Sequence, residues 1–473
     1  MGSYDVIIVG SGVIGSALAI AFANQGRKVL LIERDWSEPD RIVGELMQPG
    51  GVKALQKIGI EHCLEGIHAV DCNGYAIFKE NEKIILNYPV NKSPNQGKSF
   101  HHGRFIMNLR NEANSKSNVT VLEATVTQLI EDTKFVNRVI GVKYKKKKLT
   151  SFKTDSKLDL SNFDNETIEE ESIIAPFVVI ADGCFSKFRK QLINKSVEIK
   201  SHFVGFILKK CDLPNKNYGH VILAKPSPIL LYQISGDDTR ILIDIPGKLP
   251  NVSNGEMNKY LLDYILPQLP KSIQVSFSAA VEISKARIMP NSFLPPSKNL
   301  KEGLLILGDA MNMRHPLTGG GMTVALWDVV HVSDLLHPLK FKNFNKVKKV
   351  SEELKKLHWK RKPLSSVINI LAQALYSLFS AGDNINLIYL QEACFGYFKL
   401  GGRCVSTPVG LLAGLIPSPL TLLGHFFAVA FYGTFLIIRK NWIYLPFALI
   451  RSFLVIFTAA MVIGPVIISE LKN

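Results

Sequence analysis

The stretch Gly10-Ser11-Gly12-Val13-Ile14-Gly15 follows a short apolar run, Val6 to Val9, and opens a segment of small and apolar residues that continues to Gln25. This is G-x-G-x-x-G at a strand-to-helix junction. The first glycine makes the turn, the second lets backbone approach a pyrophosphate, and the third lets helix and strand pack closely. The helix N-terminus then stabilises the phosphate charge. The stretch predicts a βαβ unit over residues 4–35 that binds a dinucleotide, with a purely structural turn as the alternative.

The end of the next apolar run narrows the choice of dinucleotide. Glu33 follows Val29 to Ile32 and stands about twenty residues beyond the motif, where an acidic side chain holds ribose hydroxyls. Glu33 followed by Arg34 disfavours a 2′-phosphate at this position. The pair therefore favours FAD or NAD over NADP.

Two further motifs favour FAD. Leu307-Gly308-Asp309-Ala310 ends an apolar run and leads into the glycine-rich stretch His315 to Met322. Asp309 can accept a hydrogen bond from a ribityl hydroxyl, and the helix start can face the flavin edge that becomes negative on reduction. Earlier, Ala181 to Arg189 has the pattern D-G-x-x-S-x-x-R after the strand-like run Ile173 to Ile180. For Asp182 the alternative is an ordinary Asp-Gly turn.

Net charge and cysteine content limit the kinds of partner and site that the protein can have. The net charge of +16 suits nucleic acid, an anionic membrane surface or simple solubility. The chain has no zinc-finger, RNP or helix-turn-helix signature, and its apolar C-terminus favours a membrane surface among these partners. None of the six cysteines forms a CxxC pair, which indicates reduced structural thiols. His101 and His102 lack a third ligand, so we expect no metal site.

The C-terminal region is the apolar part of the chain. Cys404 to Ile438 contains no Asp, Glu, Lys or Arg, which exceeds the roughly 20 residues needed to span a bilayer. After three prolines, Leu420–Ile438 is the best helix, and Ser452–Ser469 is a second apolar stretch. A full crossing by the first helix would leave the intervening cations in the lumen, against the positive-inside tendency. We therefore expect a helical hairpin that enters the cytosolic leaflet without crossing; the cations are Arg439, Lys440 and Arg451.

These features predict an α/β fold with a Rossmann-type FAD-binding domain, an inserted β-sheet substrate domain and C-terminal membrane-anchoring helices. The first domain is expected over residues 1–195 and, continued, 301–343. The β-rich substrate domain covers 196–300, and the helical membrane-associated region covers 344–473. The polar segment 145–171 is expected to be a mobile hairpin loop.

Together, the three motifs resemble those of the hydroxylase-type flavoprotein monooxygenases. Four further stretches narrow the resemblance to the squalene epoxidases, of the fungal type: Asp40–Gly51, Phe100–Ile106, Asn312–Val324 and Tyr397–Gly402. The resemblance covers nearly the whole chain. It departs at the N-terminus, which lacks the regulatory segment of the animal enzymes, and in the longer loop 145–171.

The resemblance implies a membrane enzyme of sterol biosynthesis. It converts squalene to (S)-2,3-epoxysqualene with O2, through a flavin C4a-hydroperoxide. Electrons come from NADPH through NADPH–cytochrome P-450 reductase, and no second G-x-G-x-x-G unit follows residue 35 to hold NADPH. The family also implies the cytosolic face of the endoplasmic reticulum, a C-terminal anchor in membrane lipid, and lipid droplets as a further location.

The resemblance also assigns FAD contacts to particular positions. With the motif residues Gly10, Gly12, Gly15 and Asp182, the expected contacts are Val13, Ile14, Glu33, Arg34, Arg41, Leu46, Arg110, Val126, Asp309 and Met322. Without the resemblance, Arg41 and Arg110 would be interpreted as solvated surface charges.

The substrate side is expected to be a long apolar pocket, because epoxidation needs the alkene held close and water excluded. The expected lining is Leu223, Leu230, Tyr232, Phe379, Phe395, Phe398, Pro408, Leu411 and His425; the alternative for each is an ordinary core residue. By resemblance, Tyr75 in Asn-Gly-Tyr lies near flavin and substrate as an orienting catalytic hydroxyl.

Two other functions compete with squalene epoxidation. A phenolic-ring hydroxylase would need a polar catalytic base in the pocket, and the sequence indicates no residue for that role. A prenyl-lipid carrier without catalysis would not need the intact Asp182-Gly183 and Gly308-Asp309 motifs.

Overall fold

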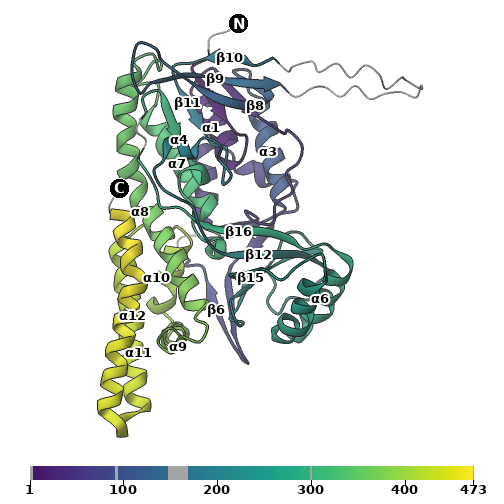
Figure 1. The fold of residues 1–473 in the computed structure, drawn as a ribbon, viewed down its shortest axis with the longest axis vertical. Coiled ribbons are helices and arrows are strands. Elements are labelled where there is room, and N and C mark those ends of the chain that lie inside the picture. Colours follow the sequence, from purple (N-terminus) through teal and green to yellow (C-terminus); the bar gives the residue numbers. More distant parts are fainter. Residues whose placement is uncertain (1–3, 91–93, 147–168, 299–300, 472–473) are drawn as a thin grey trace, which may run out of the picture.

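The computed structural model describes residues 4–90, 94–146, 169–298 and 301–471. Figure 1 shows two large sheets that follow one another along the molecule, with a column of C-terminal helices beside them. The loop expected over 145–171 lies mostly outside the described residues.

The first sheet contains the predicted βαβ unit. Its strand order is β10-β9-β8-β2-β1-β11-β17. The run from β8 to β17 is parallel, and β9 and β10 are antiparallel additions. All four residues of β1 are buried, as parallel strands covered on both faces require. The strands are β1 (Val6–Val9), β2 (Val29–Glu33), β8 (Val119–Glu131), β9 (Val139–Lys146), β10 (Glu171–Ile174), β11 (Val178–Ile180) and β17 (Leu304–Ile306).

Three helices pack together beside this sheet. α1 (Val13–Asn24) contacts both α3 (His102–Asn114) and α7 (Gly321–Leu335). Their apolar faces share one buried cluster with β1 and β2. α2 (Pro49–Ile58) contacts α7. The segment that follows β2 therefore packs against the helices of the first domain. This packing fixes the N-terminus of α1 at the carboxyl edge of the sheet.

The sequence predicts one strand over residues 173–180, but the structure has two strands there. The run Ile173 to Ile180 is divided into β10 and β11, with Ala175 to Phe177 between them. Pro176 stands in this gap. Because proline has no N–H to donate to a ladder, the break falls at that residue.

The second sheet lies in the expected β-rich domain. Its strand order is β16-β12-β15-β14-β13-β5-β6. One face is covered by α5 (Glu256–Tyr260), the turns η2 (Leu261–Ile265) and η3 (Leu266–Gln268), and α6 (Lys271–Ile283). The opposite face packs toward the C-terminal helices. The strands are β5 (Gly74–Lys79), β6 (Glu82–Asn87), β12 (Glu198–Lys209), β13 (Gly219–Ile222), β14 (Ile229–Gln233), β15 (Asp238–Pro246) and β16 (Arg287–Phe293).

The second sheet takes strands from two distant segments. β5 pairs in parallel with β13, with Tyr75 opposite Gly219. Residues 74–87 therefore belong to the second sheet, although the expected boundaries place them inside the first domain, 1–195. A small sheet of β3 (Leu46–Met47), β7 (Gly97–Ser99) and β4 (Val70–Cys72) joins the two layers.

The C-terminal region is entirely helical apart from its turns. α8 (Val347–Phe379), α9 (Ile385–Lys399) and α10 (Arg403–Leu412) close the open side of the second sheet. α11 (Pro419–Lys440) and α12 (Leu445–Leu471) form a hairpin joined by η6 (Trp442–Tyr444). The hairpin runs along one side of the molecule, and its turn projects past the rest of the fold (Figure 1).

The hairpin has the composition of a membrane segment. Pro419–Lys440 and Trp442–Leu471 are both long and apolar enough to cross a bilayer, and about a quarter of each is buried within the protein. Large apolar side chains cover its turn and outer face, including Trp442, Ile443 and Phe453. Arg439 and Lys440 are exposed beside the turn. Arg451, by contrast, is half-buried: it donates through Nη1 to Asn386 and lies over Tyr389, while its Nε is buried without a partner among the described residues.

Candidate active site

A cavity of about 600 Å³ lies where the two sheets meet. One end is formed by the loops at the carboxyl ends of β1 and β2, which is where open α/β sheets bind ligands. The other end reaches β13 and β14 of the second sheet. Between them lie the segment after β2, the turn after β11, and the two turns η4 (Gly308–Ala310) and η5 (Pro316–Thr318).

The glycine motif has the geometry its spacing predicts. A β-carbon on Gly15 would lie 1.8 Å from the carbonyl oxygen of Gly10, so only glycine lets α1 approach β1 this closely. Gly10 has φ +100°, in the region that favours glycine. A β-carbon on Gly12 would meet no atom within 4 Å. The backbone at Gly12 therefore faces open cavity at the N-terminus of α1.

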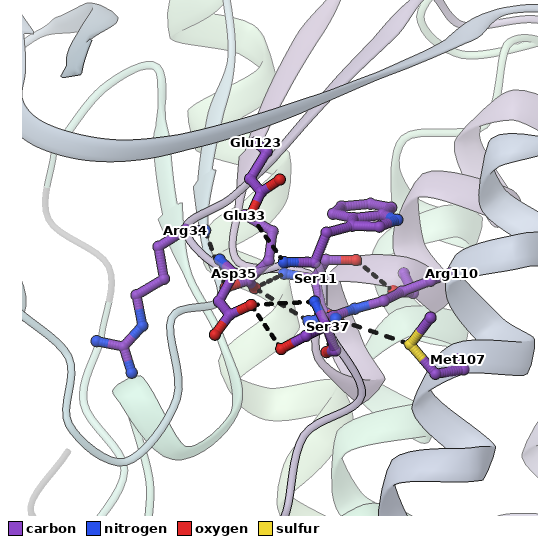
Figure 2. Close-up of polar contacts among 10 residues, drawn as sticks. Ser11, Glu33, Arg34, Asp35, Ser37, Met107, Arg110 and Glu123 are labelled. Atoms are coloured by element: carbon purple, nitrogen blue, oxygen red, sulfur yellow. Dashed lines mark hydrogen bonds and ion pairs between the residues drawn. The ribbon is translucent and has the colours of Figure 1, made fainter. Parts of the chain in front are cut away.

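Glu33 is fixed by backbone donors at the end of β2. Its Oε2 accepts from the amide of Ser11 at 2.7 Å, and its Oε1 accepts from the amide of Arg34 at 2.9 Å. The guanidinium of Arg110 lies 3.7 Å from Oε2. Figure 2 shows these groups converging on Glu33, whereas the side chain of Arg34 extends away from them. Glu33 is thus oriented by the Arg34 main chain and not by the Arg34 side chain.

Arg110 is a buried structural cation, not a solvated surface charge. Its side chain is 4% exposed. It donates to the carbonyl oxygens of Ser11 and Ser37 at 3.0 and 2.8 Å and lies over the ring of Trp36. Burial lowers its pKa, and the charge of Glu33 opposes that effect. Arg41, in contrast, is exposed and lines the same cavity.

Arg189 connects the two remaining motifs. It donates to the carbonyl oxygens of Cys184 and Asp309 at 2.7 and 2.8 Å and to Ala310 at 2.9 Å. The last residue of the D-G-x-x-S-x-x-R pattern therefore joins the turn after β11 to the turn after β17. Asp182 and Asp309 both line the cavity as a result.

Asp309 is surrounded by protein atoms, but its side chain is exposed to the cavity that it lines. Burial raises its pKa, and the nearby charges of Arg314, Arg41 and Arg189 oppose this effect. Asp182 is similar: burial raises its pKa, while its Oδ2 accepts from the amide of Lys187 at 3.0 Å. The Asp309 carboxylate is therefore open to hydroxyl donors in the cavity, whereas Oδ1 of Asp182 is buried and has no partner among the described residues.

A hydrogen-bonded group at η5 forms the wall between this cavity and the apolar region behind it. The side-chain amide of Gln48 donates to the carbonyl oxygen of Thr318 at 2.8 Å and also to the hydroxyl of Tyr75. Tyr75 itself lies 3.4 Å from the same carbonyl. The hydroxyl of Tyr88 donates to the other end of Gln48 at 2.7 Å. All four residues are buried.

His315 holds η5 from the other side. Its Nδ1 accepts from the amide of Leu317 at 3.2 Å, so its Nε2 carries the proton toward Asp244 and Ser201, at 3.5 and 3.3 Å. The ring stacks on Tyr376 of α8, with centroids 4.0 Å apart. The turn is therefore fixed to both β15 and α8.

A buried ion pair fixes the segment between β2 and β3. Arg240 of β15 donates through two nitrogens to the carboxylate of Glu45, each at 2.8 Å. Tyr232 lies 3.4 Å from the same carboxylate, and all three side chains are buried. This bidentate pair joins the segment that carries Arg41 and Leu46 to the second sheet.

A second cavity, of about 100 Å³, lies beyond η5 and is almost wholly apolar. Its walls come from β5, β13, α8, α9, α10 and α11. Tyr75, Val221 and Leu317 line both cavities. At the far end, His425 of α11 contacts the hydroxyl of Tyr397 at 2.9 Å. The polar and apolar cavities therefore share one wall.

The expected cofactor residues converge on the first cavity. Every one of them lines it except Gly15, which packs against β1 instead. Of the expected substrate residues, one group lines the apolar cavity together with Tyr75: Phe379, Phe398, Pro408, Leu411 and His425. Leu230 and Tyr232 line the first cavity. Leu223 and Phe395 line neither; they pack in the apolar core shared with α8 to α10.

Sequence reasoning missed Gln48, Glu45 and Arg240. Gln48 and Glu45 stand in the quoted stretch Asp40–Gly51, but nothing local indicates their partners. Arg240 stands at the start of the strand-like run Arg240–Ile245, in which Asp244 is the other buried charged residue and the remaining positions are apolar. Charged residues inside such a run were the available signal, because buried charges are paired.

The two adjacent histidines contact different groups. His101 lies 3.0 Å from a carboxylate oxygen of Asp238, and His102 contacts the carbonyl of Gly44 at 3.0 Å. No cluster of three potential metal ligands occurs among the residues that the structure describes. All six cysteines are described, and none is in a disulfide.

Comparison with known proteins identifies close relatives. The family model for squalene epoxidase matches residues 174–450. Squalene monooxygenase of Mus musculus is 46% identical, covering 99% of this chain and 78% of its own. Squalene epoxidase ERG1 of Candida albicans is 42% identical, covering 99% of both chains.

Solved structures share the fold at low identity. The p-nitrophenol 4-monooxygenase PnpA of Pseudomonas putida aligns with a TM-score of 0.66 at 16% identity, over 88% of this chain and 98% of its own. PqsL of Pseudomonas aeruginosa, described as a probable FAD-dependent monooxygenase, aligns with a TM-score of 0.63 at 18% identity, over 80% and 97%. At these identities the likeness concerns the fold.

Proposed function

The chain belongs to the squalene epoxidase family. From this premise we propose which of its two cavities binds the cofactor and which binds the substrate. The protein is an FAD-dependent squalene monooxygenase. FAD occupies the cavity of about 600 Å³, and the reacting end of squalene occupies the apolar cavity behind Tyr75. The observation that carries this division is the shared wall of Tyr75, Val221 and Leu317.

The residues of the first cavity fit FAD in order along its length. Open space over Gly12 at the N-terminus of α1 suits the pyrophosphate. Glu33, oriented by backbone donors, suits ribose hydroxyls on the adenosine side. Asp309, open to the cavity, suits a ribityl hydroxyl. Leu46 and Met322 then line the end nearest Tyr75, where the ring system would lie.

Bound FAD supplies the activation of O2, and the chain's own residues position and protect the reaction. The apolar cavity excludes water from the alkene, which delays unproductive loss of activated oxygen. Burial raises the pKa of Tyr75 well above its usual range, so the hydroxyl stays protonated. Tyr75 therefore orients groups by hydrogen bonding and does not act as an acid.

The apolar cavity must enlarge to admit squalene. Its volume of about 100 Å³ is well below the roughly 300–1,000 Å³ of typical ligand pockets. Its outer wall includes Leu422, His425 and Phe426 of α11, the first helix of the anchor hairpin. We propose that substrate enters when this wall moves away from α8 and α9.

The anchor hairpin supports a membrane location. Its outer face is apolar and its turn carries Trp442 and Tyr444, which are side-chain types that favour the bilayer interface. We propose that the hairpin inserts from the cytosolic face of the endoplasmic reticulum membrane, with lipid droplets as a further location. Squalene dissolved in the same lipid then lies next to α11.

Product analysis tests the activity directly. Purified protein with squalene, NADPH, O2 and a cytochrome P-450 reductase is expected to form 2,3-epoxysqualene, and omission of O2 is expected to stop it. Purified protein that carries FAD and turns over with the reductase, yet leaves squalene unchanged, would contradict the substrate assignment.

The source of electrons needs a separate experiment. We propose transfer from NADPH through the reductase, and the net charge of +16 suits docking to an acidic partner surface. NADPH alone should reduce the flavin slowly, and added reductase should restore turnover in a salt-sensitive way. Rapid stoichiometric reduction by NADPH in stopped flow, with no reductase present, would refute this route.

A further inference from the structure

The last turn of α12 carries a buried carboxylate. Glu470 is 4% exposed, although the helix before it presents apolar side chains to the outside. Its Oε1 accepts from the side-chain amide of Asn369 at 2.7 Å, and its Oε2 lies 3.2 Å from the ammonium of Lys362. Both partners belong to α8. Because an unpaired buried charge is strongly unfavourable, these contacts fix the end of the anchor hairpin against α8.

The contacts continue from Glu470 toward the FAD cavity. The amide of Asn369 also lies 3.3 Å from the side-chain oxygen of Asn312. That same oxygen accepts from Arg314 at 2.7 Å and lies 3.5 Å from Arg361. Asn312 is fully buried, so its one side-chain oxygen is shared among donors from three residues.

Arg361 has a second anchor in Asp328, whereas Arg314 is held by Asn312. Two nitrogens of Arg361 donate to the carboxylate of Asp328, each at 2.9 Å. Among the residues that the structure describes, the hydrogen bonds of Arg314 go to the side chain and carbonyl of Asn312, at 2.7 and 3.2 Å. Its Nε and Nη1 are buried and have no partner among the described residues. The orientation of Arg314 therefore depends on Asn312.

Arg314 lines the FAD cavity next to Asp309. Burial lowers the pKa of Arg314 to about 10, and the charge of Asp309 is the largest effect that opposes it. The cation in turn counteracts the raised pKa of Asp309. A displaced Arg314 would thus alter both the shape and the charge of the cavity beside the carboxylate proposed to hold the ribityl chain.

We infer that Glu470 is a positioning residue for FAD, acting through Asn369, Asn312 and Arg314. The last turn of the anchor hairpin is then part of the support of the cofactor site as well as of the membrane attachment. This inference rests on FAD binding in the first cavity, as proposed above. It implies that FAD affinity depends on the seating of α12 against α8.

The test compares Glu470→Ala and Glu470→Gln with Leu471→Ala, a neighbouring change at an exposed position. FAD affinity is measured in detergent by flavin fluorescence, together with the visible circular dichroism of bound flavin and the thermal unfolding of the apoprotein. Glu470→Ala is expected to weaken FAD binding by about tenfold or more. Glu470→Gln, whose amide oxygen still accepts from Asn369, is expected to lose less. Leu471→Ala should match wild type, and all three should stay membrane-bound in high salt.

A second change separates positioning from general damage. Without the Glu470 carboxylate, Lys362 loses its counter-ion and keeps its contact with the main-chain carbonyl oxygen of residue 470. Glu470→Ala/Lys362→Met removes that uncompensated charge but gives Asn369 no acceptor, so it should recover unfolding temperature while FAD affinity stays as weak as in Glu470→Ala. Full recovery of affinity would assign the loss to the buried charge and overturn the inference. If Glu470→Ala does not fold, Glu470→Gln decides: altered flavin dichroism at unchanged unfolding temperature supports the inference. Affinity within about twofold of wild type, with unchanged dichroism, in whichever of the two variants folds would overturn it. Wild-type protein that binds no FAD would instead refute the proposed function.

Discussion

The wall between the two cavities predicts a selective effect of replacing Tyr75 by phenylalanine. The change removes one hydroxyl, which contacts the carbonyl of Thr318 and accepts from the side-chain amide of Gln48. Gln48 is fully buried, so one of its N–H groups is left unpaired. The ring of Tyr75 still fills the wall, and FAD binding should be unchanged.

The magnitude follows from that unpaired donor. A buried donor without a partner costs about 1–3 kcal/mol. If this loss appears in the transition state, because η5 and the alkene are no longer held together, turnover falls by about 5- to 160-fold, since each 1.36 kcal/mol is tenfold. The free energy of unfolding should fall by a similar 1–3 kcal/mol.

Tyr88→Phe is the matched control. Its hydroxyl donates to the side-chain oxygen of the same Gln48 at 2.7 Å, and its ring packs edge-on to Tyr75. Tyr88 lines neither cavity. The control should therefore lose comparable stability, but its turnover should stay within about twofold of wild type.

The assay measures epoxysqualene formation with saturating reductase, alongside flavin content and urea unfolding, for wild type and both variants. The reasoning is refuted if Tyr75→Phe turns over like wild type. It is equally refuted if Tyr88→Phe loses as much turnover as Tyr75→Phe, because the loss would then follow from stability alone.

Three further changes have directions set by the structure. Asp309→Ala should lose FAD or turnover, because a ribityl donor would go unpaired at a cost of about 1–3 kcal/mol; normal flavin content with normal turnover would count against the assignment. Removal of residues from Leu420 onward should release the protein from membranes, since α11 and α12 carry the apolar outer face, and a truncated protein that resists high-salt extraction would show a second anchor. Burial lowers the pKa of His220 from 6.5 to about 4, so the unfolded chain binds the proton first. The folded state with neutral His220 is therefore fully favoured above about pH 6.5. As the pH falls toward 4, protonation of the unfolded chain lowers the free energy of unfolding by up to about 3 kcal/mol. His220→Phe should flatten that fall in thermal unfolding measured against pH, and an unchanged slope would contradict it.

Local patterns predicted the nucleotide half of the fold well. The glycine stretch specifies its own geometry, because Gly10 and Gly15 must approach within a few ångström for α1 to start where it does. Glu33 and Asp309 follow strands directly, so their position at the carboxyl edge of the sheet follows from chain order. The resemblance added Arg110, whose burial and role no local pattern indicated.

The lining of the apolar cavity could not be predicted from local patterns, because it is set by contacts between distant segments. Nothing near Leu223 or Phe395 distinguishes them from Leu230 or Phe398, which do line a cavity. The difference is which face of the strand or helix turns inward, and that is set by packing against α8 to α11. Gln48 illustrates the same limit, since its partners Tyr75 and Thr318 come from two other segments of the chain.

The parallel pairing of β5 with β13 has a consequence for how the chain can be made and divided. A fragment that begins after residue 195 would lack β5 and β6, leaving the edge of β13 unpaired and open to aggregation. A fragment that ends there would carry the same two strands with no sheet to join. During synthesis β5 emerges long before β13 and must wait for it, and such non-local parallel pairing is intrinsically slow. Expression of either layer alone should therefore yield insoluble protein. During synthesis, chaperones should be needed most in the interval after β5 has left the ribosome and before β13 has done so.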